Sequence, residues 1–163
     1  MTEQPAGSNR DRRKDGITAA QVKVAGGGSW LIGQAWCGVW ACMAALAGGV
    51  KIAKPYRWAS VRLIKADAQA KVNGFRGWIA GAPSRSDWET HIFRGDKVIW
   101  FDGSTDHVET VRSIDFKRRL VVTEGGNTSS GPGGSQSNGG GAFKRFRPFS
   151  AVTGFALVNF PDK

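Results

Sequence analysis

Cysteine and histidine are scarce in this sequence, which has two of each among 163 residues. Cys37 and Cys42 stand five positions apart, and on a helix that spacing turns the two side chains away from each other, so we expect no disulfide between them. So few thiols and imidazoles also disfavour a zinc site with the usual number of protein ligands. We therefore expect neither a metal nor a cofactor.

Acidic residues are outnumbered, with 13 Asp and Glu against 23 Lys and Arg and a net charge of +10. This imbalance predicts a polyanionic partner such as nucleic acid, anionic lipid or an anionic cell-wall polymer, and charge alone does not choose among them. The length suits one hydrophobic core, so we expect a single domain.

A long apolar run is also missing. No residue is charged between Lys23 and Lys51, but glycines and Gln34 leave only residues 37–47 as a continuous helix former. That is about half of the ~20 residues that a bilayer span requires. The apolar run also begins behind a segment rich in Asp, Arg and Lys, which disfavours a signal peptide. We expect no membrane span, and we interpret residues 37–47 as a buried central helix.

Helical patterns come first in the chain and strand patterns follow. We expect residues 1–16 to form a flexible or loop-like arm and residues 17–163 to form the domain. Helices are predicted over 17–25, 37–47 and 56–72, and strands over 97–101, 107–113, 119–124, 142–147 and 154–160. This order predicts an α+β fold with N-terminal helices packed on an antiparallel sheet of about five strands.

The segment 125–141 between the third and fourth predicted strands is rich in Gly, Ser and Asn. Its composition is that of a flexible linker. Because it joins two strands of one sheet, a wide functional loop is an equal alternative.

Cys37 stands at the entry to the predicted central helix. Unpaired backbone N–H groups at a helix N-terminus favour thiolate over thiol, and therefore favour nucleophilic chemistry. A buried, inert cysteine that begins a core helix is the alternative. A cysteine nucleophile needs a histidine, and His107, at a strand start after a polar turn, is favoured over His91.

Several short motifs occur in the order and approximate spacing of CHAP-domain (cysteine, histidine-dependent amidohydrolase/peptidase) peptidoglycan hydrolases, and the chain resembles that family, especially its bacteriophage and actinobacterial members. The resemblance runs from near the start of the chain to Phe160. The motifs that carry it are Pro5-Ala-Gly-Ser-Asn-Arg10, Gln34-Ala-Trp-Cys37, Gly95-Asp-Lys-Val-Ile-Trp-Phe-Asp102, Asp106-His-Val108, Gly126-Asn-Thr-Ser-Ser130 and Gly134-Ser-Gln-Ser-Asn-Gly139.

The resemblance implies a papain-like (NlpC/P60-type) fold in which Cys37 is the nucleophile and His107 the general base and acid. Gln34 and Trp36, just before the cysteine, become candidates for oxyanion or substrate contacts. The implied reaction is cleavage of an amide bond in bacterial peptidoglycan through a thioester, by an amidase or an endopeptidase. A phage endolysin or virion-associated lysin would act as a monomer, staying in the host cytoplasm until release or travelling with the virion.

The third catalytic position departs from the family pattern. Many relatives have Glu-Gly-Asn there, whereas this chain has Glu124-Gly-Gly-Asn127, which puts Gly125 where that glutamate would stand. Strand side chains alternate, so Glu124 should face away from His107 unless a bulge corrects the register. Otherwise Asn127 would orient the imidazole through its amide oxygen, and we favour Asn127 slightly over Glu124.

Glu109 is a second departure, because relatives more often have a small residue after His-Val. It shares a strand face with His107, so it is a candidate to line the cleft, to contact a cationic substrate group or to raise the pKa of the imidazole. A carboxylate at a solvated rim is the alternative.

Tryptophans and basic clusters suggest how a wall substrate could be held. Trp30, Trp78 and Trp88 fall in loops, where they would stack on sugar rings or cap the core. The basic clusters 10–14, 117–119 and 144–147 are either wall-polymer contacts or a solvated face. Two other functions stay open: a degenerate homologue that binds the wall without cutting it, and a basic nucleic-acid binder, for which no module signature is present.

Overall fold

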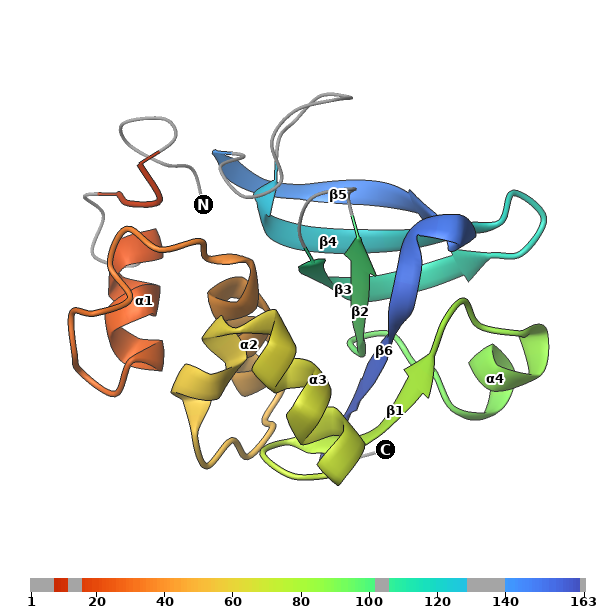
Figure 1. The fold of residues 1–163 in the computed structure, drawn as a ribbon, viewed down its shortest axis with the longest axis horizontal. Coiled ribbons are helices and arrows are strands. Elements are labelled where there is room, and N and C mark those ends of the chain that lie inside the picture. The colour runs from red at the N-terminus through yellow and green to blue at the C-terminus, as the bar shows by residue number, and fades with distance from the viewer. Residues whose placement is uncertain (1–7, 12–15, 102–105, 129–139, 162–163) are drawn as a thin grey trace.

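The computed structural model describes residues 8–11, 16–101, 106–128 and 140–161. These residues form an α+β fold in which the helices that precede the first strand cover one side of an antiparallel sheet (Figure 1). The helices are α1 (Ile17–Val24), α2 (Cys37–Ala47), the 3-10 helix η1 (Pro55–Ala59), α3 (Val61–Ala70), α4 (Arg85–Thr90) and the 3-10 helix η2 (Phe149–Ala151). The strands are β1 (Phe75–Ala80), β2 (Lys97–Phe101), β3 (Asp106–Asp115), β4 (Leu120–Thr128), β5 (Gly141–Pro148) and β6 (Val152–Val158).

The sheet has six strands in the order β1-β6-β2-β3-β4-β5, and every neighbouring pair is antiparallel. The α+β class is therefore confirmed, and the five predicted strands are all present. The additional strand, β1, is an edge strand that pairs with β6 through a register irregularity between Phe75 and Gly77. An interior glycine weakens a strand pattern, which is why sequence reasoning missed this element.

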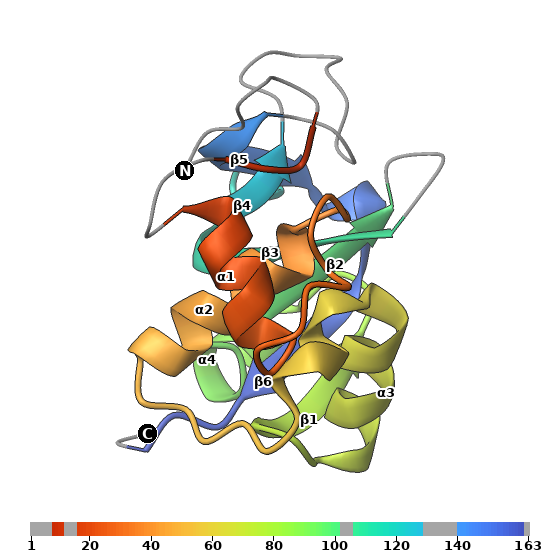
Figure 2. The ribbon, with the colours of Figure 1, turned by 90° about the vertical axis from the view of Figure 1, so that its left-hand side faces the viewer.

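The central helix α2 lies between the other helices and the sheet. It contacts β3 and β4 on one side and α1 and η1 on the other, while α3 covers β1 and β6 (Figures 1 and 2). Ala41, Cys42 and Ala45 of α2 are completely buried. The predicted buried helix over residues 37–47 is confirmed, since six of its eleven residues are buried and none of its side chains is charged.

The predicted helix over 56–72 is wrong as one element, because it is broken at Ser60, whose backbone is extended. The break lets η1 insert Trp58 into the core, where its ring stacks on Phe75 at 4.3 Å and its Nε1 donates to the Asn73 carbonyl. η1 also packs closely on α2, since a Cβ on Gly38 would fall 2.0 Å from the Trp58 carbonyl oxygen. Glycine is thus required where α2 meets η1.

A second hydrophobic cluster covers the other face of the sheet and includes Val98, Val111, Val121 and Phe155. The sheet therefore carries buried residues on both faces, which is why its central strands are rich in apolar residues. No helix in the described residues is long and apolar enough to cross a membrane.

Two regional expectations fall partly outside the described residues. In the expected arm, residues 1–7 and 12–15 are outside, while Asp11 binds the N-terminal part of α1: its backbone N–H and carbonyl both bond to the Thr18 hydroxyl. In the Gly-rich segment, residues 129–139 are outside, and the flanking residues belong to β4 and β5.

Candidate active site

Cys37 is the first residue of α2, and its side chain is only 7% exposed. As the first helical residue, it has an N–H that lies outside the intrahelical hydrogen-bond ladder. The N-cap residue is Trp36, and no side chain in the described structure caps this end of the helix. The positive end of the helix dipole therefore acts on the thiol itself.

His107 reaches Cys37 from the second residue of β3. A side-chain hydrogen bond joins the imidazole to the thiol. Nε2 of His107 has no hydrogen-bond partner among the described residues, so we assign the bond to Nδ1. The ring of Trp100, the residue opposite on β2, packs against the imidazole in an edge-to-face arrangement with 5.4 Å between ring centroids. His91, the competing histidine, lies exposed at the C-terminal end of α4.

The two groups of this pair shift each other's ionisation. Burial by itself raises the pKa of Cys37, but the charge and hydrogen bond of His107, with the backbone N–H groups of Val108 and Gly38, leave that pKa below its ordinary value. Burial by itself lowers the pKa of His107. The charge and hydrogen bond of Cys37, together with the charge of Glu109, outweigh burial and leave that pKa above its ordinary value. These opposite shifts favour a thiolate–imidazolium pair.

Glu109 supplies a carboxylate close to the imidazole. It is completely buried, and its Oε1 lies 3.6 Å from Nε2 of His107. Arg147 of β5 binds both carboxylate oxygens, with Nε donating to Oε2 at 2.9 Å, and the Thr123 hydroxyl of β4 donates to Oε2 at 2.5 Å. The interpretation of Glu109 as a solvated rim carboxylate is therefore wrong, because three strands enclose it.

Glu124 lies on the opposite face of β4 from Thr123, and its carboxylate pairs with Arg112 at 2.5 Å. The expected bulge does occur in β4, but it falls between Gly126 and Thr128 and so does not return Glu124 to the face of His107. Gly125, by contrast, is directed at the site: a Cβ there would fall 2.5 Å from Cγ of Glu109.

Asn127 is buried at that bulge, with its backbone in the left-handed region at a φ of 58°. Trp36 is 1% exposed, and its ring lies against Gly126, where a Cβ would fall 2.4 Å from the ring. The Trp36 ring thus packs α2 onto β4 and is not available to a substrate. Asn127 keeps its place as a candidate for orienting His107.

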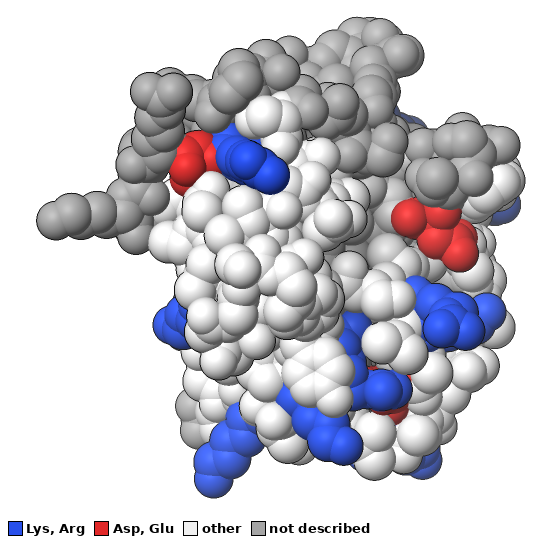
Figure 3. Space-filling model, turned by 60° about the vertical axis from the view of Figure 1, so that its left-hand side comes forward, with Lys and Arg blue, Asp and Glu red and all other residues white. Residues whose placement is uncertain are grey.

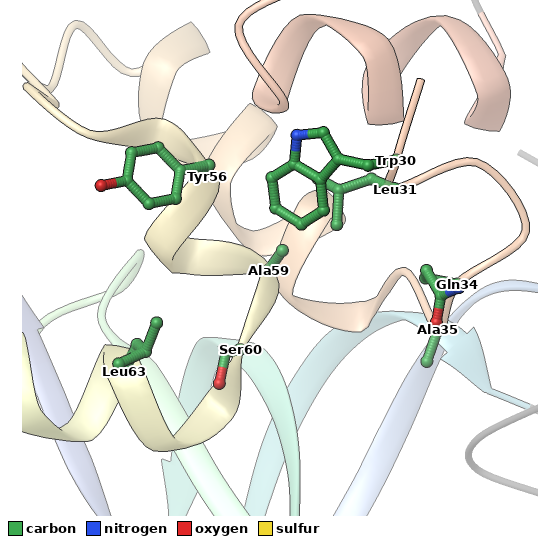
Figure 4. A pocket seen from close by; sticks show the side chains of 8 residues that line it. All are labelled: Trp30, Leu31, Gln34, Ala35, Tyr56, Ala59, Ser60 and Leu63. Atoms are coloured by element: carbon green, nitrogen blue, oxygen red, sulfur yellow. The ribbon is translucent and has the colours of Figure 1, made fainter. Parts of the chain in front are cut away.

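Gln34 lies exposed at the rim of a pocket of about 390 Å³, three residues before Cys37. Figure 4 shows the Trp30 and Tyr56 rings toward one end of this pocket and Gln34 toward the other. Trp30 is 57% exposed and Tyr56 is 43% exposed, which is unusual for large aromatic side chains. The other lining residues are Leu31, Ala35, Ala59, Ser60 and Leu63.

Sequence reasoning missed three residues around the site: Trp100, Thr123 and Arg147. Arg147 was interpreted as part of an exposed basic cluster, which is wrong for this residue, because it is 9% exposed and its guanidinium lies 3.7 Å from the centroid of the Trp100 ring. Alternation along β5 puts Arg147 on the opposite face from Phe146 and is the only signal that could have found it. Trp78 and Trp88 pack against the two hydrophobic clusters.

Within the described ranges, no three His, Cys, Asp or Glu side chains gather where a metal ion could be held. Comparisons with models of protein families, with curated proteins and with solved structures returned no match.

Proposed function

We propose that this protein is a thiol hydrolase that cleaves an amide bond in bacterial peptidoglycan, with Cys37 as nucleophile and His107 as general acid and base. The observation that carries the proposal is the hydrogen-bonded pair of Cys37 and His107 at the uncapped N-terminus of α2, with their pKa values shifted in opposite directions. A cysteine that only packs in the core is not expected to form a hydrogen-bonded pair with a histidine in which the two pKa values shift in opposite directions.

The chemistry follows from the geometry of the pair. The Cys37 thiolate attacks the amide carbon, and the Cys37 N–H at the start of α2 stabilises the oxyanion that forms. His107 then gives its proton to the leaving nitrogen as the C–N bond breaks, which leaves a thioester. Neutral His107 next takes one proton from a water molecule, whose oxygen attacks the thioester; the acid is released, and the Cys37 thiolate and protonated His107 are restored.

Two further features favour a cell-wall substrate, in addition to the resemblance to CHAP-domain hydrolases with a papain-like fold. The pocket beside Gln34 offers exposed Trp30 and Tyr56 rings, which suit the faces of sugar rings. Basic side chains gather on the lower part of the helix-bearing face (Figure 3), and residues 51–71 contain six Lys and Arg against one acid, Asp67. Anionic wall polymers are the partners that such a surface would attract.

The deciding experiment compares three proteins on purified peptidoglycan, with mass spectrometry of the released fragments: wild type, Cys37→Ala and the matched control Cys42→Ala. Wild type and Cys42→Ala are expected to release the same fragments and Cys37→Ala none. Fragments with a free lactyl carboxyl group would identify an amidase, and cuts within the peptides an endopeptidase.

If wild type releases nothing, the hydrolase proposal fails. Wall binding by both wild type and Cys37→Ala in a sedimentation assay would then support the non-catalytic wall binder instead. The proposed place of action, the host cytoplasm until release or the virion, would be checked by fractionating infected cells and particles.

A further inference from the structure

We propose that Glu109 is the residue that positions His107 and holds its charged form, so that β3 supplies both the imidazole and its carboxylate partner. The inference rests on the proposed function only in that His107 serves Cys37. Glu109 replaces Glu124 as the principal partner of the imidazole, and Asn127 is the competing candidate from β4.

The first observation is the arrangement around Nε2 of His107. Nδ1 is assigned to the bond with Cys37, so the far side of the ring is Nε2, and Oε1 of Glu109 lies 3.6 Å from it. The Trp100 ring packs against the same imidazole. A carboxylate on the side of the imidazole opposite to the nucleophile is where a positioning group has to stand.

The second observation is that Glu109 is itself firmly held. Arg147 binds both of its oxygens, and the Thr123 hydroxyl donates a further hydrogen bond to Oε2. The guanidinium of Arg147 lies over the face of Trp100, so one tryptophan packs against both the imidazole and the arginine. A charge that is paired and hydrogen-bonded can stay ionised although it is buried.

The third observation is the space at position 125. A Cβ on Gly125 would fall 2.5 Å from Cγ and 2.9 Å from Oε1 of Glu109, so the Glu109 carboxyl fills the volume that a side chain from β4 would otherwise enter. Glu109 and a larger residue at 125 therefore exclude each other. The backbone of Gly125 does not have a positive φ, so a residue with a side chain fits there without backbone strain once Glu109 is shortened.

The charges that face the imidazole come from three elements: Cys37 of α2, Glu109 of β3 and Arg147 of β5. The first two favour imidazolium, and Arg147 opposes it. Removing the Glu109 charge while keeping a side chain of its shape leaves Arg147 unbalanced. His107 should then lose its proton at a lower pH than in the wild type.

The test uses NMR titration of the imidazole resonances, which is simple because the chain has only two histidines. In Glu109→Gln we expect the midpoint of His107 to fall by roughly one pH unit or more, the scale of one close charge. Peptidoglycan cleavage should fall roughly 100-fold, the contribution of general acid–base catalysis.

The rescue variant moves the carboxylate to β4. We expect Glu109→Ala/Gly125→Glu to recover most of the His107 midpoint and of the cleavage, and its neutral partner Glu109→Ala/Gly125→Gln to recover neither. Gly125→Glu alone should be destabilised by the clash with Glu109. This pair also carries the test if Glu109→Gln does not fold.

An unchanged His107 midpoint in a folded Glu109→Gln protein would overturn the proposal, as would a matching fall in Asn127→Ala with none in Glu109→Gln. If the midpoint shifts as expected but no protein cleaves peptidoglycan, the positioning role stands and the proposed function fails.

Discussion

Cys37 and Cys42 lie five residues apart on α2, and the protein moves their pKa values in opposite directions. Burial raises the pKa of Cys42 to about 12, although Lys97 and Lys23 oppose this. Burial also acts on Cys37, but His107 and two backbone N–H groups outweigh it and lower the pKa. The helix thus carries one thiol whose ionised form is favoured and one that stays protonated.

Alkylation with iodoacetamide at pH 6 should therefore be selective for Cys37. At that pH a thiol with a pKa of about 12 is ionised to roughly one part in a million, so Cys42 should react orders of magnitude more slowly. Peptide mapping by mass spectrometry gives both rates in one sample, and denatured protein serves as the control in which the two cysteines react alike. Equal slow labelling of the folded protein would contradict an activated thiolate.

Cleavage should show a bell-shaped pH dependence. The reactive pair needs Cys37 ionised and His107 protonated, so activity rises as pH passes the lowered pKa of Cys37 and falls as pH passes the raised pKa of His107. The falling limb should therefore lie above 6.5, the ordinary value for histidine. A falling limb below pH 6.5 would mean that the thiolate–imidazolium pair is not stabilised in the protein that cleaves the substrate.

The sequence predicted the parts of the fold that depend on local patterns. Residues 37–47 form a helix because they are uncharged and rich in alanine, and the five predicted strands form because their apolar residues are bounded by turn residues. Residues 56–72 failed as one helix because burial of Trp58, a tertiary demand, outweighs helical periodicity at Ser60.

The site was predictable as far as its motifs reach. Cys37 and His107 are brought together as expected, and alternation correctly directed Glu124 away from the imidazole. The surroundings of Glu109 were not predictable, because Arg147 lies 38 residues away in sequence and only the register of β3, β4 and β5 brings it into contact. A buried ion pair of this kind leaves no local periodic signal.

Trp30→Ala should weaken substrate binding without slowing the chemical step. Losing one stacking contact worth about 1 kcal/mol should raise KM roughly fivefold. kcat should stay unchanged, because the ring contacts the substrate equally in the ground state and the transition state. Soluble peptidoglycan fragments provide the assay. Phe146→Ala is the matched control, since Phe146 is 51% exposed on β5 and does not line the pocket. An identical KM for all three proteins would remove the pocket from the binding site.

Lys97 is a buried lysine in the core, and it should make the free energy of unfolding vary with pH in the alkaline range. It is 1% exposed, its Nζ donates to the Thr110 hydroxyl at 3.0 Å, and burial lowers its pKa from 10.5 to about 8, although Asp96 and Cys42 oppose the shift. Because the folded value lies below the unfolded one, the unfolded chain binds the proton more tightly. Burying the charged Lys97 therefore lowers the free energy of unfolding. This loss of stability is complete below pH 8, declines between pH 8 and 10.5, and is absent above 10.5.

Lys97→Met removes this dependence. The free energy of unfolding of the variant minus that of the parent should decrease by roughly 2 to 3 kcal/mol between pH 7 and pH 10.5, measured by urea denaturation at each pH. Both proteins should carry Cys42→Ala, because ionisation of Cys42 in the unfolded chain above pH 9.0 lowers stability over the same range. Asp96 keeps Arg76 as a partner at 2.9 Å in both proteins. A difference that stays constant from pH 7 to 10.5 would mean that Lys97 is hydrated in the folded protein and titrates as an ordinary lysine.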